Sequence, residues 1–348
     1  MIKKSFILIF VLLINLVITI QLKSESETSQ FSYLISKDYE ILVSPLNSTK
    51  ILDYLNNAKK AIYIEVYVMT YYPLAELLAN KSRHGIQVFV VLSRDVYGEI
   101  PSSEYDVTDY LKRNGVNVSF LDTKFKYVHS KVYVIDNQTV IVSTQNPTYS
   151  GFFRDLGVSI VIRNSTIATW FATIILNDHR GYFPAYNYPG IIVSPLNSYY
   201  QLKGLLSINE SSVYIAMEEL YNSSELVSYI LLHNNKYVVV DRSDLVTNWI
   251  RVKENLTAKL IVIGDYVYVG SINLSYSSIF KNRELGVIIK DPNLANALKS
   301  LILSWYGVKD FITTSSIITK FDYKILFIIL LLLFIIIFTI IFLIKRIF

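Results

Sequence analysis

The sequence predicts an α/β layer fold made of two similar halves, and three observations lead to this prediction. Short runs of β-branched residues alternate with helical stretches along the chain, one octapeptide recurs about 150 residues later, and each copy closes with two apolar strands joined by a turn. Alternation of this kind favours a mostly parallel sheet with helices on its faces.

The recurring octapeptide divides the chain. Residues 41–48 read Ile-Leu-Val-Ser-Pro-Leu-Asn-Ser and residues 191–198 read Ile-Ile-Val-Ser-Pro-Leu-Asn-Ser. The period is far too long for a solenoid, so a duplication explains it best. We assign the first half to residues 38–180 and the second half to residues 188–310.

The elements of the first half follow from local pattern. Apolar, β-branched runs predict the strands, and stretches of helical periodicity predict the helices between them. Asp136-Asn-Gln-Thr139 in the first half, and Gly264-Asp265 in the second, are turn sequences that predict a hairpin in each half. The predicted strands are 62–68, 87–92, 131–135, 140–143 and 157–162, and the predicted helices are 74–82 and 107–114.

The second half is shorter than the first. From Val43 to His129 there are 86 residues, whereas from Val193 to Thr257 there are 64, so about 22 residues near 96–117 have no counterpart. This segment is rich in Tyr, Asp, Glu and Ser and predicts a helix and a loop. It is either a plain surface insertion or a wall near the mouth of the site.

Both ends of the chain carry apolar segments. Residues 325–344 form 20 uncharged residues, long enough at about 1.5 Å per residue to cross a bilayer as a helix. Residues 1–24 have the layout of a signal peptide or a signal anchor, and cleavage remains open. A linker, 311–323, and a short tail, 345–348, complete the division of the chain.

Positive residues flank both apolar segments on their outer sides. The positive-inside rule therefore predicts cytoplasmic termini, unless the signal is cleaved, and an extracytoplasmic domain held at the cell membrane. Nine Asn-x-Ser/Thr sequences agree with an exported glycoprotein, where such sites are used. They begin at Asn47, Asn80, Asn117, Asn137, Asn164, Asn209, Asn222, Asn255 and Asn273.

Composition excludes several classes of function. The formal charge is +5, but four positive residues flank the terminal segments, so the rest of the chain carries no strong basic field for a polyanion. Without cysteine there is no thiol catalysis, no disulfide and no cysteine-bound metal. With four histidines in all, a multi-histidine metal cluster is not expected either.

One motif carries chemistry. Residues 129–136 read His-Ser-Lys-Val-Tyr-Val-Ile-Asp and lead into a strand. Residues i and i+2 of a strand face the same way, so His129 and Lys131 project together. An imidazole beside an ammonium, with the Asn146 amide from the next strand, makes a pocket for an oxyanion in which the imidazole can attack phosphorus. Asp155 follows and is expected to hold the imidazole in one tautomer.

At these residues the chain resembles the phospholipase D superfamily, whose members carry His-x-Lys-x-x-x-x-Asp, a following Gly/Ser-Ser/Thr-x-Asn and a downstream acid in each half. The resemblance covers about residues 38–308. It implies two α/β halves related by a pseudo-twofold with one site at their join, and phosphodiester cleavage or transfer through a phosphohistidine without metal or cofactor. By position it implies catalytic residues His129, Lys131, Asp136, Asn146 and Asp155, and phosphate ligands Lys131, Lys259, Asn146, Asn273 and Ser271.

The second copy of the motif is degenerate. Thr257 stands in place of the histidine and Gly264 in place of the aspartate, with Asp265 one position late, while Lys259 and Glu284 remain. A threonine hydroxyl cannot protonate a leaving group near neutral pH as imidazolium does, and loss of a general acid costs about 10²- to 10⁴-fold in rate. His84 and His233 are expected to be structural and His179 to lie at the surface, so none of them is expected to replace the missing group.

Two functions follow from the sequence. One is a membrane-anchored extracytoplasmic phosphodiesterase of the phospholipase D type that acts through His129 on a phospholipid headgroup, which the membrane segments favour, or on nucleic acid. The other is a catalytically impaired surface protein that binds phosphate or lipid headgroups. The sequence indicates no oligomeric state.

Overall fold

The computed structural model describes residues 31–121 and 124–308. The predicted signal or anchor (1–24), the linker (311–323), the apolar span (325–344) and the tail (345–348) lie outside these residues. Within the described part, none of the helices is long and apolar enough to cross a bilayer.

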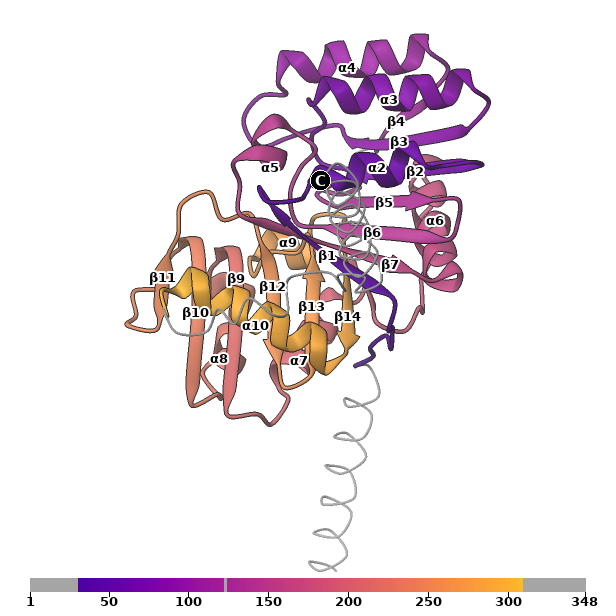
Figure 1. Cartoon of the computed structure of the whole chain (residues 1–348). Helices are drawn as coiled ribbons and strands as arrows, with labels where there is room; N and C mark the ends of the chain where they lie inside the picture. Colours follow the sequence, from indigo (N-terminus) through magenta and orange to yellow (C-terminus); the bar gives the residue numbers. More distant parts are fainter. Residues whose placement is uncertain (1–30, 122–123, 309–348) are drawn as a thin grey trace, which may run out of the picture. The chain divides into compact units, whose positions relative to one another are not determined.

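The first half is a seven-stranded sheet with helices on both faces (Figure 1). Its strand order is β1-β7-β6-β5-β2-β3-β4. The elements are β1 (Tyr39–Ser44), α2 (Lys50–Asn56), β2 (Ala61–Val66), α3 (Tyr72–Arg83), β3 (Gln87–Ser93), α4 (Ser102–Arg113), β4 (Asn117–Leu121), β5 (Lys131–Ile135), β6 (Thr139–Ser143), α5 (Tyr149–Phe153), β7 (Gly157–Arg163) and α6 (Ser165–His179).

The second half repeats this plan. Its sheet also has seven strands, in the order β11-β10-β9-β12-β13-β14-β8. The elements are β8 (Ile191–Ser194), α7 (Ser198–Leu206), β9 (Ser212–Leu220), a 3₁₀ turn (Asn222–Ser224), α8 (Val227–Ile230), β10 (Asn235–Ser243), β11 (Ile250–Val252), β12 (Lys259–Ile263), β13 (Tyr266–Gly270), α9 (Tyr276–Phe280), β14 (Glu284–Lys290) and α10 (Pro292–Tyr306). The two similar α/β halves are confirmed.

The expectation of a mostly parallel sheet is wrong. In the first half only the β2–β3 and β3–β4 pairs are parallel, and in the second half only β9–β10 and β10–β11. The other neighbouring strands are antiparallel, because each motif hairpin returns directly and the strand after it returns again. Both sheets are therefore mixed.

The two predicted turns are confirmed. β5 and β6 are joined by residues 136–138, and β12 and β13 by residues 264–265, so the second hairpin is one residue shorter. Gly264 has a φ of 55°, a left-handed conformation that glycine adopts without strain.

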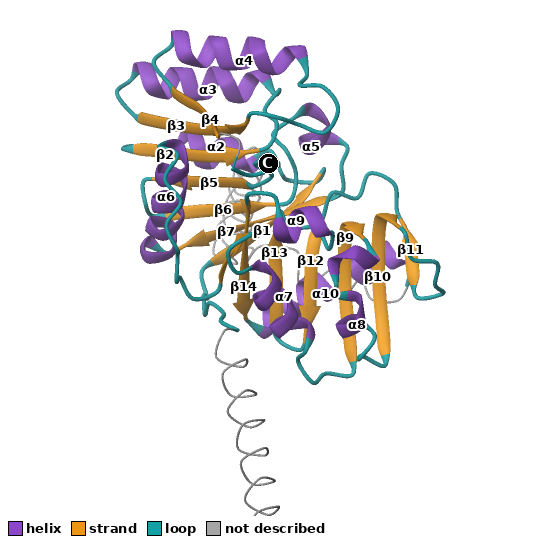
Figure 2. Cartoon of the chain, turned by 180° about the vertical axis from the view of Figure 1, so that it is seen from behind, coloured by secondary structure: helices purple, strands orange, loops and turns teal. Residues whose placement is uncertain are grey.

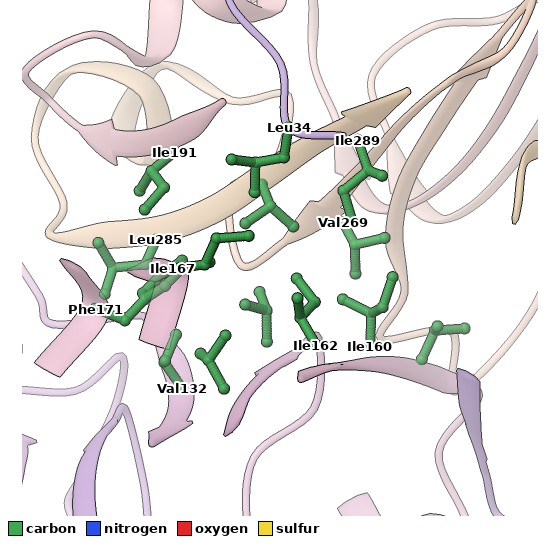
Figure 3. Close-up of a cluster of buried hydrophobic side chains, with 14 of the residues drawn as sticks. Leu34, Val132, Ile160, Ile162, Ile167, Phe171, Ile191, Val269, Leu285 and Ile289 are labelled. Carbon is green, nitrogen blue, oxygen red and sulfur yellow. The ribbon is translucent and has the colours of Figure 1, made fainter. Parts of the chain in front are cut away.

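Apolar residues of both halves form one continuous core between the sheets (Figure 3). Val132, Ile160 and Ile162 of the first half meet Val269 and Ile289 of the second. α6 covers one face of the first sheet and α10 one face of the second, and both helices belong to this core. Figure 2 shows α6 across the first sheet, on the face opposite α3. The halves share a core, so the site residues that each half carries are fixed relative to one another.

The residues without a counterpart in the second half form α4 and the loop before it. α4 packs against α3 and buries Glu104, whose side chain accepts a hydrogen bond from Met69 N at 3.2 Å. The loop reaches toward the site, because Tyr97 N donates to the Tyr67 hydroxyl, and Tyr67 packs on His129. The segment is thus a surface helix attached to a loop that supports one wall of the site.

Glu104 makes the stability of the chain depend on pH. Burial raises the pKa of Glu104 to about 7, although the Met69 N–H opposes the shift. The folded state therefore binds a proton more tightly than the unfolded state, and the free energy of unfolding is expected to fall as pH rises from about 4.5 to about 7. In urea unfolding of the full chain, Glu104→Gln should flatten this slope. Glu76→Gln, on the exposed face of α3, is the control and should keep it; an unchanged slope in Glu104→Gln would contradict the assignment.

Candidate active site at the join of the halves

The two motif hairpins place their lysines at equivalent strand starts. Lys131 opens β5 opposite Val66 of β2, and Lys259 opens β12 opposite Met217 of β9. Both lysine side chains are 1% exposed. Burial, and next the charge of Lys259, lower the pKa of Lys131 well below its ordinary value.

His129 is held by the other half of the molecule. Its Nδ1 lies 3.1 Å from Glu284 Oε2, and the Glu284 side chain is fully buried. The backbone fixes the same pairing, since His129 N donates to Arg283 O at 2.7 Å. Because Nδ1–H donates to the carboxylate, Nε2 carries the lone pair that attacks an electrophile.

The expected partner of His129, Asp155, is therefore wrong. Asp155 accepts instead from Ser150 Oγ at 2.5 Å, within the loop of its own half. Burial raises its pKa. In each half the acid follows its own motif at a similar spacing, and the cross-half packing decides which one reaches the histidine.

The protonation state of His129 suits a nucleophile. Burial and the Lys131 charge lower its pKa, while Glu284 opposes the shift. The imidazole is 16% exposed and packs edge-on against the Tyr67 ring at 4.7 Å between centroids. A neutral, oriented and partly accessible imidazole results.

The asparagines differ in how they are held. Asn273 is 3% exposed, and its Oδ1 accepts from Glu219 N at 3.1 Å, which fixes the amide. Such burial excludes the glycan that the sequence Asn273-Leu-Ser would otherwise allow. Asn146 has a buried Oδ1 without a hydrogen-bond partner among the described residues. This atom is an acceptor, so a ligand would have to donate a hydrogen bond to it, which a phosphodiester oxygen cannot do.

Two further predicted residues are structural. Ser271 is fully buried, and its hydroxyl bonds the backbone of Leu285, which leaves nothing for phosphate. Asp136 lies at the far end of β5, where its carboxylate accepts from the N–H groups of Lys59, Lys60 and Ala61. The prediction that these two side chains take part directly in the site is therefore wrong, because both are hydrogen-bonded to backbone groups of neighbouring strands and turns.

The degenerate positions of the second half follow from local packing. Gly264 occupies the position of Asp136, and a Cβ there would lie 3.0 Å from the Glu210 carboxylate. Asp265 takes part in the turn through its backbone oxygen, which accepts from Asp291 N. Neither residue reaches the lysines through a hydrogen bond that the structure records.

Thr257 cannot replace a histidine. Its Oγ1 is buried and has no hydrogen-bond partner among residues 31–121 and 124–308. The hydroxyl lies against the first half, since a Cβ on Gly157 would be 3.0 Å from it. The Thr257 hydroxyl is therefore directed into packing and not toward a leaving group.

The remaining histidines lie elsewhere, as expected. His84 ends α3 and bonds Asn80 O, His233 is buried against Glu210 O and Leu206 O, and His179 bonds Asn117 O at the end of α6. None of them supplies a second imidazole to His129.

One site residue, Glu218, was missed by sequence reasoning. Its carboxylate forms a short hydrogen bond with Lys259 Nζ and lies 3.0 Å from Arg242 Nη2. Burial opposes ionisation, but attraction from Lys259, His129 and Lys131 lowers the pKa of Glu218 to about 2. The only signal in the sequence was a glutamate at the end of an apolar strand.

A buried cluster of charged side chains lies at the residues next to His129 and Glu284 in sequence. Arg283 Nε and Nη2 donate to Asp178 at 2.7 and 2.8 Å, and Ser130 Oγ donates to Glu65 at 2.6 Å. Burial and repulsion from Asp178 raise the pKa of Glu65 well above its ordinary value. The cluster joins β2 and α6 to the residue beside Glu284.

A family model described as "Cardiolipin synthase, PLD-like domain" matches residues 51–179 and 198–304, which covers most of both halves. The chain belongs to the phospholipase D superfamily.

Individual relatives of this superfamily are distant. A curated phospholipase D from Rickettsia typhi is 28% identical over 134 residues, which are 37% of this chain and 63% of that protein. The chain thus spans less than two thirds of the length of this relative.

Solved structures support the fold. The phosphatidylserine synthase of Haemophilus influenzae Rd KW20 aligns with a TM-score of 0.59 at 14% identity, over 80% of this chain and 88% of its own. The polyphosphate kinase of Porphyromonas gingivalis aligns with a TM-score of 0.61 at 13% identity, over 76% of this chain and 50% of its own. At such identities the likeness shows the two-half phospholipase D-like fold alone.

Proposed function

We propose that the chain is a phosphodiesterase of the phospholipase D type that forms a phosphohistidine at His129. The observation that carries the proposal is the cross-half pair of His129 and Glu284, which directs Nε2 away from the pair, beside two buried lysines from opposite halves. An oriented imidazole next to paired cations is the arrangement that nucleophilic attack on an anionic phosphodiester requires.

A phospholipid headgroup is the substrate that we favour. The apolar segments at 1–24 and 325–344 would hold the domain at a membrane, where headgroups are abundant. Nucleic acid is the other phosphodiester considered, and assays on phospholipid vesicles and on single-stranded DNA distinguish the two.

Trapping the intermediate tests the proposal. The full chain is mixed with bis-p-nitrophenyl phosphate, quenched, and analysed by mass spectrometry for an added mono-ester phosphoryl group on His129. We expect the adduct in the wild type and none in His129→Ala. No adduct, together with hydrolysis no faster than in His129→Ala, would contradict the enzymatic function.

A second function is favoured by one observation. Thr257 replaces the second histidine and its hydroxyl lies in packing, so the chain keeps the phosphate-holding lysines without a second imidazole. The second candidate function is therefore that of a protein that binds phosphate or lipid headgroups without turnover. Its phosphate affinity should fall in Lys131→Ala and in Lys259→Ala; unchanged affinity in both would exclude it.

A further inference from the structure

Glu218 occupies the place next to the lost histidine. In the first half the residue after Val66 is Tyr67. Its ring packs on His129, with 4.7 Å between the ring centroids, and Lys131 Nζ lies 5.3 Å from the Tyr67 centroid. Strand register makes Glu218 the equivalent of Tyr67, because Val66 pairs with Lys131 as Met217 pairs with Lys259. Glu218 is therefore a carboxylate where the first half has a phenol beside its histidine.

The hydrogen bonds of Lys259 confirm this placement. Its Nζ donates to Thr257 O at 3.0 Å, to Thr144 O at 3.2 Å and to Glu218. The carboxylate and the Thr257 carbonyl thus share the Lys259 ammonium. An ammonium has three N–H donors, and these three acceptors use all of them.

We propose that Glu218 does the work of the missing histidine and protonates the leaving alcohol. The inference rests on the proposed phosphodiesterase function. No donor of the ammonium is free, so a phosphate oxygen that binds Lys259 must displace one of the three acceptors, and Glu218 is the side chain among them, whereas the other two are backbone carbonyls. The substrate anion thereby removes the main partner of the carboxylate and adds a negative charge beside it.

The charges around Glu218 set the direction of this change. With the phosphodiester on Lys259, the nearest cation left to Glu218 is Arg242, which is shared with Glu219 and Asp241. Loss of an opposite charge and gain of a like charge both favour the protonated carboxyl, so substrate binding is expected to take up a proton. The groups that face Glu218 are Lys259, Arg242, Lys131, His129, Asp155, Glu219, Tyr67 and Tyr221.

The chemical step then balances. His129 Nε2 forms a bond to phosphorus, the bond to the leaving oxygen breaks, and that oxygen keeps the electron pair and takes the proton of Glu218. Water next attacks the phosphohistidine and gives its proton to the Glu218 carboxylate, while the P–N bond breaks and its electron pair returns to His129. The proton that was taken up with the substrate is released with the product, and the hydrogen bond between Lys259 and Glu218 forms again.

Proton uptake on binding tests the inference without turnover. In the full chain carrying His129→Asn, which removes the titrating imidazole, dimethyl phosphate is titrated at pH 6 by calorimetry in two buffers of different ionisation enthalpy. We expect net proton uptake on binding, which increases as the pH is lowered, is retained with Glu219→Gln and is lost with Glu218→Gln. Uptake that persists in Glu218→Gln overturns the inference, even if the proposed phosphodiesterase activity stands.

The leaving group provides the second test. A p-nitrophenolate departs without a proton and an alkoxide does not, so Glu218→Gln in the wild-type background should lower the first-turnover rate on an alkyl diester by about 10²- to 10⁴-fold and leave the first-turnover burst of p-nitrophenolate nearly unchanged. Later turnovers should slow on both esters, because Glu218 also takes the proton of the attacking water. Glu218→Asp, which keeps an acid, should restore part of the alkyl rate. An equal loss of the first-turnover rate on both esters would show a structural effect and overturn the inference, whereas no hydrolysis in the wild type would refute the proposed function and leave the binding test intact.

Discussion

Replacing Glu284 with glutamine is expected to lower the rate of phosphodiester hydrolysis by about 10²- to 10⁴-fold, because the amide keeps the shape of the side chain but loses its charge. Glu284 bonds Nδ1 of His129, which favours the tautomer with a free Nε2, and in the proposed reaction it would stabilise the cation that forms as Nε2 bonds phosphorus. Rates on bis-p-nitrophenyl phosphate measure this effect.

The pH dependence of kcat/KM distinguishes a loss of the His129–Glu284 interaction from a general disruption of the site. Glu284 raises the pKa of His129, so its removal should lower that pKa and move the acid limb of kcat/KM to lower pH. Asp155→Asn is the matched control: it neutralises the equivalent acid of the first half, which bonds Ser150, and should leave the rate near that of the wild type. A larger loss in Asp155→Asn than in Glu284→Gln would restore the pairing that the sequence suggested.

Replacing Arg283 with methionine is expected to destabilise the fold by about 3–5 kcal/mol, because Asp178 would remain buried without a counter-charge beside Glu65. Arg283 and Asp178 have side chains 3% and 0% exposed, and their pair ties the second half to α6 of the first. Urea unfolding of the full chain, followed by tryptophan fluorescence, measures the loss.

Two further variants serve as controls for Arg283→Met. Arg163→Met removes ion pairs to Asp38 and Glu40 from an arginine that is 38% exposed, and should cost less than about 1 kcal/mol. The double variant Arg283→Met, Asp178→Leu removes both charges and should recover most of the stability. If Arg283→Met cost no more than Arg163→Met, the cluster would not join the halves.

The local sequence pattern was sufficient to predict several strands and helices of the first half. The strands at 131–135, 140–143 and 157–162 and the helix at 74–82 lie within two residues of the observed elements, because period-2 and helical patterns are set by neighbours in sequence. The direction of the strands was not predictable in the same way. Burial on both faces gives antiparallel and parallel strands the same apolar pattern, and the sheets are mixed.

The sequence by itself determined the family resemblance, the two halves, the proposed nucleophile His129 and the two lysines, because the spacing of His129 and Lys131 is a property of one strand. Only the tertiary structure decided which acid holds His129 and what stands beside Thr257. Asp155 and Glu284 follow their motifs in the same way, and the choice between them depends on a contact between residues 155 apart. Glu218 belongs to no motif, and its proximity to Lys259 arises from the pairing of β9 with β12. Packing between strands and halves brings these charges together, and no local pattern encodes such contacts.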